Sequence, residues 1–304
     1  MIKLNIIAIL GVVCMYACYK PVCSYFRSVG QGRRKGGTTA SSVQDKNIGL
    51  SVFIVISAAA LLVRLIAAII YRGHETDMNC FVSWSDMVFN DGFNTFYKSE
   101  SFTDYPPGYM YILYVIGAIR SLLGMAWDSV ATNVMVKLPA IIADIGSGYL
   151  IYHIASKRIK ETGAAILSAL YLFCPAVILD GAVWGQTDAV FTFFVALMCY
   201  FITENKLIPS YFVFALGILI KPQTLIFTPV LICGIIDQVF LEDFNWNKFF
   251  KNLAFGIGAI LLIGLLMLPY GFHDALGQYT ETLGSYEYAS VNAYNIWTMM
   301  GLNW

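Results

Sequence analysis

The chain has 304 residues, of which 58% are hydrophobic and only 12% are charged, and its mean hydropathy is +0.67. A soluble domain carries about a quarter charged residues, and the deficit here extends along the whole chain, which excludes a soluble protein with a single anchor. The formal net charge is zero, so the composition gives no argument for a nucleic-acid partner. The sequence predicts an all-α, polytopic transmembrane helical bundle.

The residue types that usually bind metals show no ligand pattern. Most of the seven cysteines lie inside apolar runs, where they are expected to be small buried side chains. The three histidines, His74, His153 and His273, are far apart in the sequence. We therefore predict neither a metal nor a cofactor.

The apolar segments begin with residues 4–19, which are short and predict either a first span or a signal-like segment; we favour a span. A span needs about 20 mostly apolar residues. Further candidates lie at 49–71, 133–153, 163–180, 187–203 and 249–270, together with a pair at 207–221 and 223–240. That pair meets at Lys221-Pro222-Gln223, which no single helix would carry at its centre, so it predicts a broken pair of helical segments. Residues 1–48 thus form an N-terminal apolar segment with a basic loop, and 49–304 form the membrane domain.

Basic residues in short loops predict the orientation, because such loops are retained in the cytoplasm. Three loops qualify: residues 20–48, the group Lys157, Arg158 and Lys160, and the pair Lys248 and Lys251. An even number of crossings must separate residue 48 from residue 157, yet three apolar segments lie between them. We predict that 108–125, which is short, carries Arg120 and follows two prolines, is re-entrant or interfacial on the outer side.

This parity places most of the unusual polar residues on one face of the membrane. The segments 72–107, 181–187, the break at Lys221 and 271–304 would all lie outside the cytoplasm. The sequence therefore predicts an outward-facing site.

The loop 72–107 contains an expected amphipathic helix on the membrane surface. Asp77, Phe81, Trp84 and Val88 recur at intervals of three and four residues, which is helical spacing. Asp77 at the start of this helix has two open roles, because Asp is a preferred N-cap and is also a suitable catalytic carboxylate.

Other polar residues lie where spans begin or end. Asp104-Tyr105-Pro106-Pro107 predicts a rigid extended turn, which is either structural or part of a site. Trp184 in Trp184-Gly185-Gln186-Thr187-Asp188 fits an ordinary interfacial aromatic position, whereas Gln186 and Asp188 are less usual because polar groups in hydrocarbon are costly.

Charges within the apolar segments leave further alternatives open. Lys221 could extend to the surface or could bind an anionic phosphate. Asp144 lies seven residues after Lys137 on the same helical face, so it indicates either a functional carboxylate or a structural pair. Arg64 is similarly open.

A set of motifs follows in a fixed order along residues 49–304: Arg64 in the first span, Thr76-Asp77-Met78, Phe81-x-x-Trp84, Asp104-Tyr105-Pro106-Pro107-Gly108, Leu138-Pro139 with Asp144, Trp184 to Asp188, Lys221-Pro222-Gln223, and Asn292-Ala293-Tyr294-Asn295-Ile296-Trp297. This ordered set resembles the GT-C superfamily of membrane glycosyltransferases. Within that superfamily it most resembles the bacterial proteins related to GPI mannosyltransferases and to dolichol-linked oligosaccharide glucosyltransferases.

The resemblance implies transfer of a mannosyl or other hexosyl group from a polyprenyl-phosphate-linked donor to a glycan, lipid or protein acceptor. Asp77 matches the catalytic carboxylate and would be the general base, with Glu75 and Asp104 as alternatives. The donor phosphate would be bound by Lys221, Gln223 and Arg64. The substrate cavity would be lined by Trp84, Tyr105, Trp184, Gln186, Asp188, Asn295 and Trp297.

Three further expectations concern the extent of the chain, the alternative class and the location. Its members usually continue through several more spans, so we expect this chain to be a fragment or a shortened gene product. A lipid-linked sugar transporter or flippase is the alternative class, although we see no internal repeat of the kind that such folds show. The expected location is the bacterial plasma membrane, with an extracytoplasmic active site.

Overall fold

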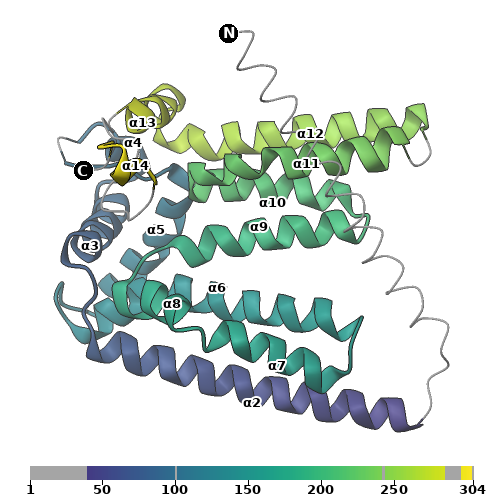
Figure 1. Ribbon diagram of the computed structural model, residues 1–304. Coiled ribbons are helices and arrows are strands. Elements are labelled where there is room, and N and C mark those ends of the chain that lie inside the picture. The colour runs from purple at the N-terminus through teal and green to yellow at the C-terminus, as the bar shows by residue number, and fades with distance from the viewer. Residues whose placement is uncertain (1–39, 100, 242–243, 285–295, 303–304) are drawn as a thin grey trace.

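The computed structural model describes residues 40–99, 101–241, 244–284 and 296–302 (Figure 1). Within these ranges the chain forms helices and no β-strand. The prediction of an all-α membrane bundle is therefore confirmed, whereas the predicted first span at 4–19 lies outside the described residues.

A row of long helices forms the body of the molecule and lies roughly parallel in Figure 1. The row consists of α2 (Ala40–Ile70), α6 (Val130–Ser156), α7 (Glu161–Leu172), α9 (Asp188–Thr203), α10 (Leu207–Ile220), α11 (Thr228–Ile235) with the π-helical η3 (Ile236–Leu241), and α12 (Trp246–Met267).

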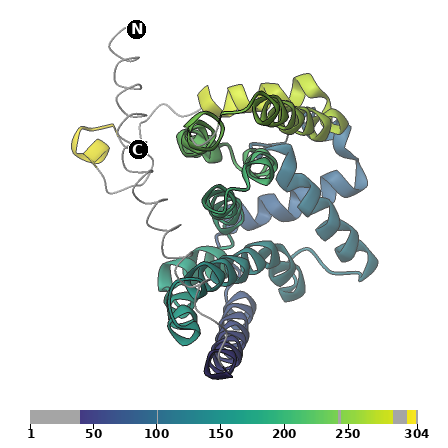
Figure 2. The ribbon, with the colours of Figure 1, turned by 90° about the vertical axis from the view of Figure 1, so that its right-hand side faces the viewer.

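The other elements, most of them short, gather at one end of this row, on the left of Figure 1. They are α3 (Glu75–Asn90), α4 (Phe93–Phe96), α5 (Pro107–Leu122), α8 (Pro175–Ile178), the π-helical η1 (Leu179–Trp184), the 3-10 helices η2 (Pro222–Phe227) and η4 (Leu268–Tyr270), and α13 (Phe272–Gly284). The last short helix, α14 (Ile296–Met299), lies apart from the bundle in Figure 2.

Four helical segments in the described ranges are long and apolar enough to cross a membrane: Ile48–Ile70, Val130–Ser156, Pro222–Leu241 and Trp246–Tyr270. The predicted span 163–180 is instead a bent pair, Glu161–Leu172 and Pro175–Trp184, with an angle of 54° between its halves. Pro175 accounts for the break, because proline cannot donate the backbone hydrogen bond that a continuous helix needs. Two predicted spans, 187–203 and 207–221, are the shorter helices α9 and α10.

The apolar surface of the spans is consistent with a lipid environment. Large apolar side chains are exposed along α2 and α12, among them Ile54, Val55, Ile70, Ile260 and Leu261. A soluble protein rarely exposes apolar surface of this extent, whereas hydrocarbon chains solvate it without cost.

The two ends of the bundle differ as the parity of the basic loops predicts. α6 ends just before Lys157 and Arg158, and α12 begins just before Lys248 and Lys251, at the end of the row opposite to the short elements in Figure 1. The four segments 72–107, 181–187, the break at Lys221 and 271–284 all belong to the end with the short elements. The salt bridge from Lys98 to Asp274, with 3.7 Å between Nζ and Oδ2, joins the first of these segments to the last.

The predicted amphipathic helix is α3, which runs from Glu75 to Asn90 and buries Phe81, Trp84 and Val88. Its N-cap position is occupied by His74, so the hypothesis that Asp77 is the N-cap is wrong, and Asp77 lies in the first turn instead. α3 packs closely on α5 at Gly117, where a Cβ atom would lie 2.3 Å from the carbonyl oxygen of Ser85.

The segment 108–125 corresponds to α5, whose 16 residues are too few for a perpendicular span. Arg120 near its end is buried and donates from Nη1 to Asp86 Oδ1 at 2.6 Å and to Ser85 Oγ at 2.9 Å on α3. This ion pair explains how a charged residue fits an apolar helix. The path of α5 relative to the membrane surface stays a prediction.

Candidate functional site

Asp77 is the centre of a hydrogen-bonded cluster that joins α3 to the end of η1. Its Oδ2 accepts hydrogen bonds from Gln186 Nε2 at 2.6 Å and from Trp184 Nε1 at 2.7 Å, and His74 Nδ1 lies 3.3 Å away. In the part of the chain that the structure describes, Asp77 Oδ1 accepts no hydrogen bond. The carboxylate is therefore oriented through one oxygen while the other remains available to a ligand.

The turn that carries Trp184 and Gln186 has a constrained backbone. Gly185 adopts φ +94, and its amide and that of Gln186 both donate to the Asp180 carbonyl at 3.1 Å. The Trp184 carbonyl in turn accepts the amide of His74 at 2.9 Å, directly before α3. Since Gly73 has φ +102 and a Cβ there would lie 2.3 Å from the Trp184 oxygen, only glycine permits this approach.

Lys221 forms a second cluster beside the first. Its ammonium pairs with Asp188 and lies 5.8 Å from the centres of the Tyr105 and Phe191 rings. Tyr105 links the two clusters, because its hydroxyl lies 3.2 Å from Thr187 Oγ1, next to Gln186.

The packing of α5 on α10 brings Tyr105 and Lys221 together. A Cβ at Gly108 would lie 2.6 Å from the Leu219 carbonyl oxygen, so the two backbones touch. Tyr105 precedes this contact by three residues and Lys221 follows it by two. Pro222 then ends the regular helix, which leaves the Lys221 side chain at the end of α10 with an exposed fraction of 15%.

Asp104 adds a half-buried carboxyl to the same region. Burial raises the pKa of Asp104, whereas a backbone hydrogen bond and the nearby Lys221 lower it, and Asp77 raises it by a smaller amount. Among the described residues, two buried acceptor atoms here have no hydrogen-bond donor, Asp104 Oδ1 and Gln186 Oε1. Unpaired buried acceptors are costly, so these atoms are suited to bind the hydroxyl groups of a ligand.

The other predicted site residues have different surroundings. Trp84 is only 3% exposed, in the aromatic core, and its indole donates to the Phe102 carbonyl at 2.8 Å. Arg64 is fully buried between α2, α6 and α7, where it pairs with Asp144 at 2.9 Å. Gln223 is exposed after the break in the helix, and Glu75 is exposed in the first turn of α3.

The last predicted motif is only partly described. Asn295 lies outside the described residues, whereas Trp297 lies in α14 with an exposed fraction of 42%. In Figure 2, α14 is separate from the helices that carry Asp77 and Lys221. The helix that contains Trp297 is therefore apart from the helices of the cluster in this view.

Sequence reasoning missed three members of the site region. His74 stacks on Trp184 with 5.0 Å between the ring centres, and Asp180 accepts the two amides of the turn. The sequence indicates Lys137 only as a possible partner of Asp144, but its ammonium instead binds backbone carbonyls next to the Asp77 cluster. A lysine in an apolar helix was the only signal for this, and it did not indicate the partners.

In the described ranges, no three His, Cys, Asp or Glu side chains come close enough to hold a metal ion. What the site offers is a fixed carboxylate, unpaired acceptors and a lysine, all at one end of a membrane bundle. This arrangement can bind a hydroxylated ligand, accept a proton from it and balance negative charge.

The fold and site thus define a polytopic membrane protein with a polar site at one end of its helices. A family model, glycosyltransferase family 87, matches residues 102–302. The chain belongs to this family and is therefore a membrane glycosyltransferase. A comparison with curated proteins finds no match.

Proposed function

We propose that the chain transfers a mannosyl or other hexosyl group from a polyprenyl-phosphate-linked donor to an acceptor hydroxyl on the extracytoplasmic face. Family membership supports the transfer of a sugar. The observation that carries the mechanism is Asp77, whose Oδ2 is held by Trp184 and Gln186 while Oδ1 accepts no hydrogen bond from the described residues.

Asp77 would be the general base. Its free oxygen would take the proton of the acceptor hydroxyl as that oxygen attacks the anomeric carbon, and the bond from this carbon to the lipid phosphate would break with its electron pair going to the phosphate. A single displacement of this kind inverts the anomeric carbon. The two donors fix the orientation of the carboxylate before the substrate arrives.

Lys221 would stabilise the departing phosphate. A lipid phosphate is a good leaving group that needs positive charge more than a proton, and a lysine ammonium supplies a point charge. Asp188 holds the ammonium in place, and the Tyr105 and Phe191 rings flank it. The partly buried setting strengthens its interaction with a phosphate.

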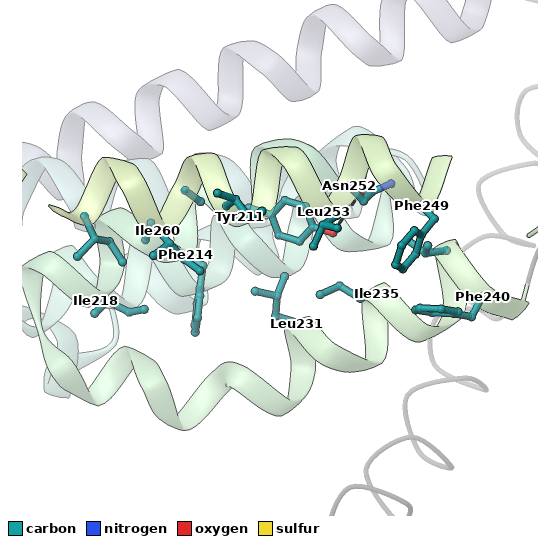
Figure 3. A pocket seen from close by; sticks show the side chains of 16 residues that line it. Tyr211, Phe214, Ile218, Leu231, Ile235, Phe240, Phe249, Asn252, Leu253 and Ile260 are labelled. Atoms are coloured by element: carbon teal, nitrogen blue, oxygen red, sulfur yellow. Dashed lines mark hydrogen bonds between the residues drawn. The ribbon is translucent and has the colours of Figure 1, made fainter. Parts of the chain in front are cut away.

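A groove along the bundle supports a donor with a long apolar chain. A cavity of about 430 Å³ lies between α10, α11 with η3, and α12 (Figure 3). It is apolar except near the Tyr211 hydroxyl and Asn252 Oδ1, which lie 3.2 Å apart. Ile218 in its lining precedes Lys221 by three residues, so a phosphate at Lys221 could continue into a chain in the groove.

The test is transfer of radiolabelled sugar from a polyprenyl-phosphate donor by the purified protein in nanodiscs. Asp77→Asn keeps the shape of the side chain and an oxygen for Trp184 and Gln186, so the fold and donor binding should stay close to wild type. Turnover should fall by about 10²–10⁴-fold, which is the usual contribution of a general base. Glu75→Gln is the matched control, because it removes a carboxylate from the same helical turn.

Three outcomes distinguish the alternatives. Near-normal turnover of Asp77→Asn would place the base elsewhere, with Glu75 and Asp104 as the next residues to replace. Loss of turnover in Glu75→Gln alone would identify Glu75 as the base. Movement of intact donor across the membrane of reconstituted vesicles, without sugar transfer, would instead indicate a flippase.

A further inference from the structure

Lys137 is a fully buried lysine near the end of the bundle that carries the candidate site. It lies in the first half of α6, and its Nζ donates to the carbonyl oxygens of Tyr71 at 2.7 Å, Val183 at 3.0 Å and Ala182 at 3.1 Å. An ammonium group has three hydrogens and no acceptor capacity, so these three contacts use all of its donors.

The three acceptors belong to two helix ends. Tyr71 directly follows α2, while Ala182 and Val183 lie in the last turn of η1. Carbonyl groups at a helix end have no partner within the helix, and the helix dipole adds negative potential there. Where such groups are buried away from water they need a donor from the protein. Lys137 meets this need for both ends at once.

The two ends lead directly into the Asp77 cluster. Gly73 comes two residues after Tyr71 and precedes His74, which is the N-cap of α3. Val183 is directly followed by Trp184. In addition to their contacts with Lys137, the two segments are joined directly by the hydrogen bond from the His74 amide to the Trp184 carbonyl at 2.9 Å. The Lys137 side chain also passes under the turn, since a Cβ at Gly185 would lie 3.4 Å from Lys137 Cε.

We propose that Lys137 is a positioning residue for the transferase: by holding the end of α2 and the end of η1 on α6, it sets Trp184 and Gln186 against Asp77. Its ammonium donates to these three carbonyls and not to the Asp77 carboxylate, so it acts through the backbone of the turn. The catalytic part of this inference depends on the proposed role of Asp77, whereas the structural part does not.

The experiment compares Lys137→Met with wild type in nanodiscs by two readouts. Met keeps the length and apolar character of the stem but removes all three donors. Hydrogen–deuterium exchange should rise selectively in peptides that cover 71–75 and 182–187. The kcat for sugar transfer should fall about tenfold or more, since a displacement of about 1 Å at a reacting group can cost 10²-fold, while KM for the donor stays within about twofold.

Leu150→Ala is the control for general loss of stability, because it removes buried volume from the same helix more than three turns away. It should leave both the exchange at 182–187 and kcat unchanged. If Lys137→Met does not fold, Lys137→Gln, which retains two N–H donors, should show a smaller change in the same direction.

Wild-type exchange at 71–75 and 182–187 in Lys137→Met would overturn the proposal, as would an equal rise of exchange along the whole of α6. Failure of both the Met and Gln variants to fold would also overturn it, because Lys137 would then be required for the fold as a whole. A selective rise of exchange together with an active Asp77→Asn variant would retain the positioning of the turn but refute Asp77 as the base.

Discussion

Replacing the ion pair between Arg64 and Asp144 tests whether Arg64 stabilises the fold or binds the donor phosphate. Both side chains are 0% exposed, and Arg64 Nε lies 2.9 Å from Asp144 Oδ2. Arg64 Nη1 also donates to the Leu172 carbonyl at 2.8 Å, so the guanidinium joins α2 to both α6 and α7. Arg64→Met would leave a buried carboxylate without its cation, which costs about 3–5 kcal/mol in comparable pairs.

The double variant Arg64→Met with Asp144→Leu should recover most of this loss. Replacing both members of a buried pair with apolar residues is often neutral, because the desolvation penalty disappears together with the attraction. Some loss should remain, since the Leu172 carbonyl loses its donor and the Tyr171 hydroxyl loses its contact with Asp144 Oδ1 at 3.3 Å.

The assay is equilibrium unfolding in mixed micelles, with donor affinity measured on the same samples. We expect a destabilised single variant, a largely restored double variant, and wild-type donor affinity in the double variant. If the double variant is as unstable as the single one, the pair does not behave as a buried ion pair. If its stability returns but donor affinity is lost, Arg64 binds the donor phosphate as the family resemblance implies.

Three further predictions concern the site and its orientation. Lys221→Met should weaken the affinity for polyprenyl-phosphate sugar about tenfold or more, and Lys221→Arg should retain part of the affinity because the charge survives. Equal affinity in wild type and both variants would mean that Lys221 only pairs with Asp188. In a background without native cysteines, a cysteine replacing Ser99 or Ser129 should label from outside intact cells, and one replacing Lys35 should not. The reverse pattern would mean that the orientation is inverted. Labelling of position 129 only after permeabilisation would show that α5 crosses the membrane. Burial raises the pKa of Asp104 in the folded state above its value in the unfolded chain. The stability contributed by protonated Asp104 is therefore present below the unfolded-state pKa and is lost as pH rises through the folded-state pKa. Asp104→Asn should reduce this loss when the free energy of unfolding is measured against pH, and an unchanged pH dependence would contradict the prediction.

Local and compositional signals predicted the architecture well. The 3.6-residue period from Phe81 to Val88 correctly indicates a helix with one buried face, because side chains on that face pack against α5. The distribution of Lys and Arg correctly separates the two ends of the bundle. The break at Pro222 follows from the backbone chemistry of proline alone.

The partners of the charged residues could not be predicted in the same way. Asp144 lies two helical turns after Lys137 on the same face of α6, but the two side chains have different partners. Asp144 pairs with Arg64 on α2, whereas Lys137 binds the ends of α2 and η1. Likewise, Trp184 lies 107 residues from Asp77 in the sequence. Such contacts depend on how helices pack, whereas spacing within one helix restricts only which face a side chain occupies.

The site lies where the helices are interrupted, and the membrane environment explains this position. Hydrocarbon excludes irregular backbone unless the protein satisfies its polar groups. Each interruption here has such a partner: Lys137 for the ends of α2 and η1, the Asp180 carbonyl for the amides of Gly185 and Gln186, and the Gly217 carbonyl for the Lys221 amide. Once the backbone is satisfied in this way, the side chains of the same segments are free to face a substrate. If Asp77 is the base as proposed, replacing Lys137 and replacing Asp77 should affect the same step for different reasons, because Lys137 binds the backbone beside the side chains that hold the Asp77 carboxylate.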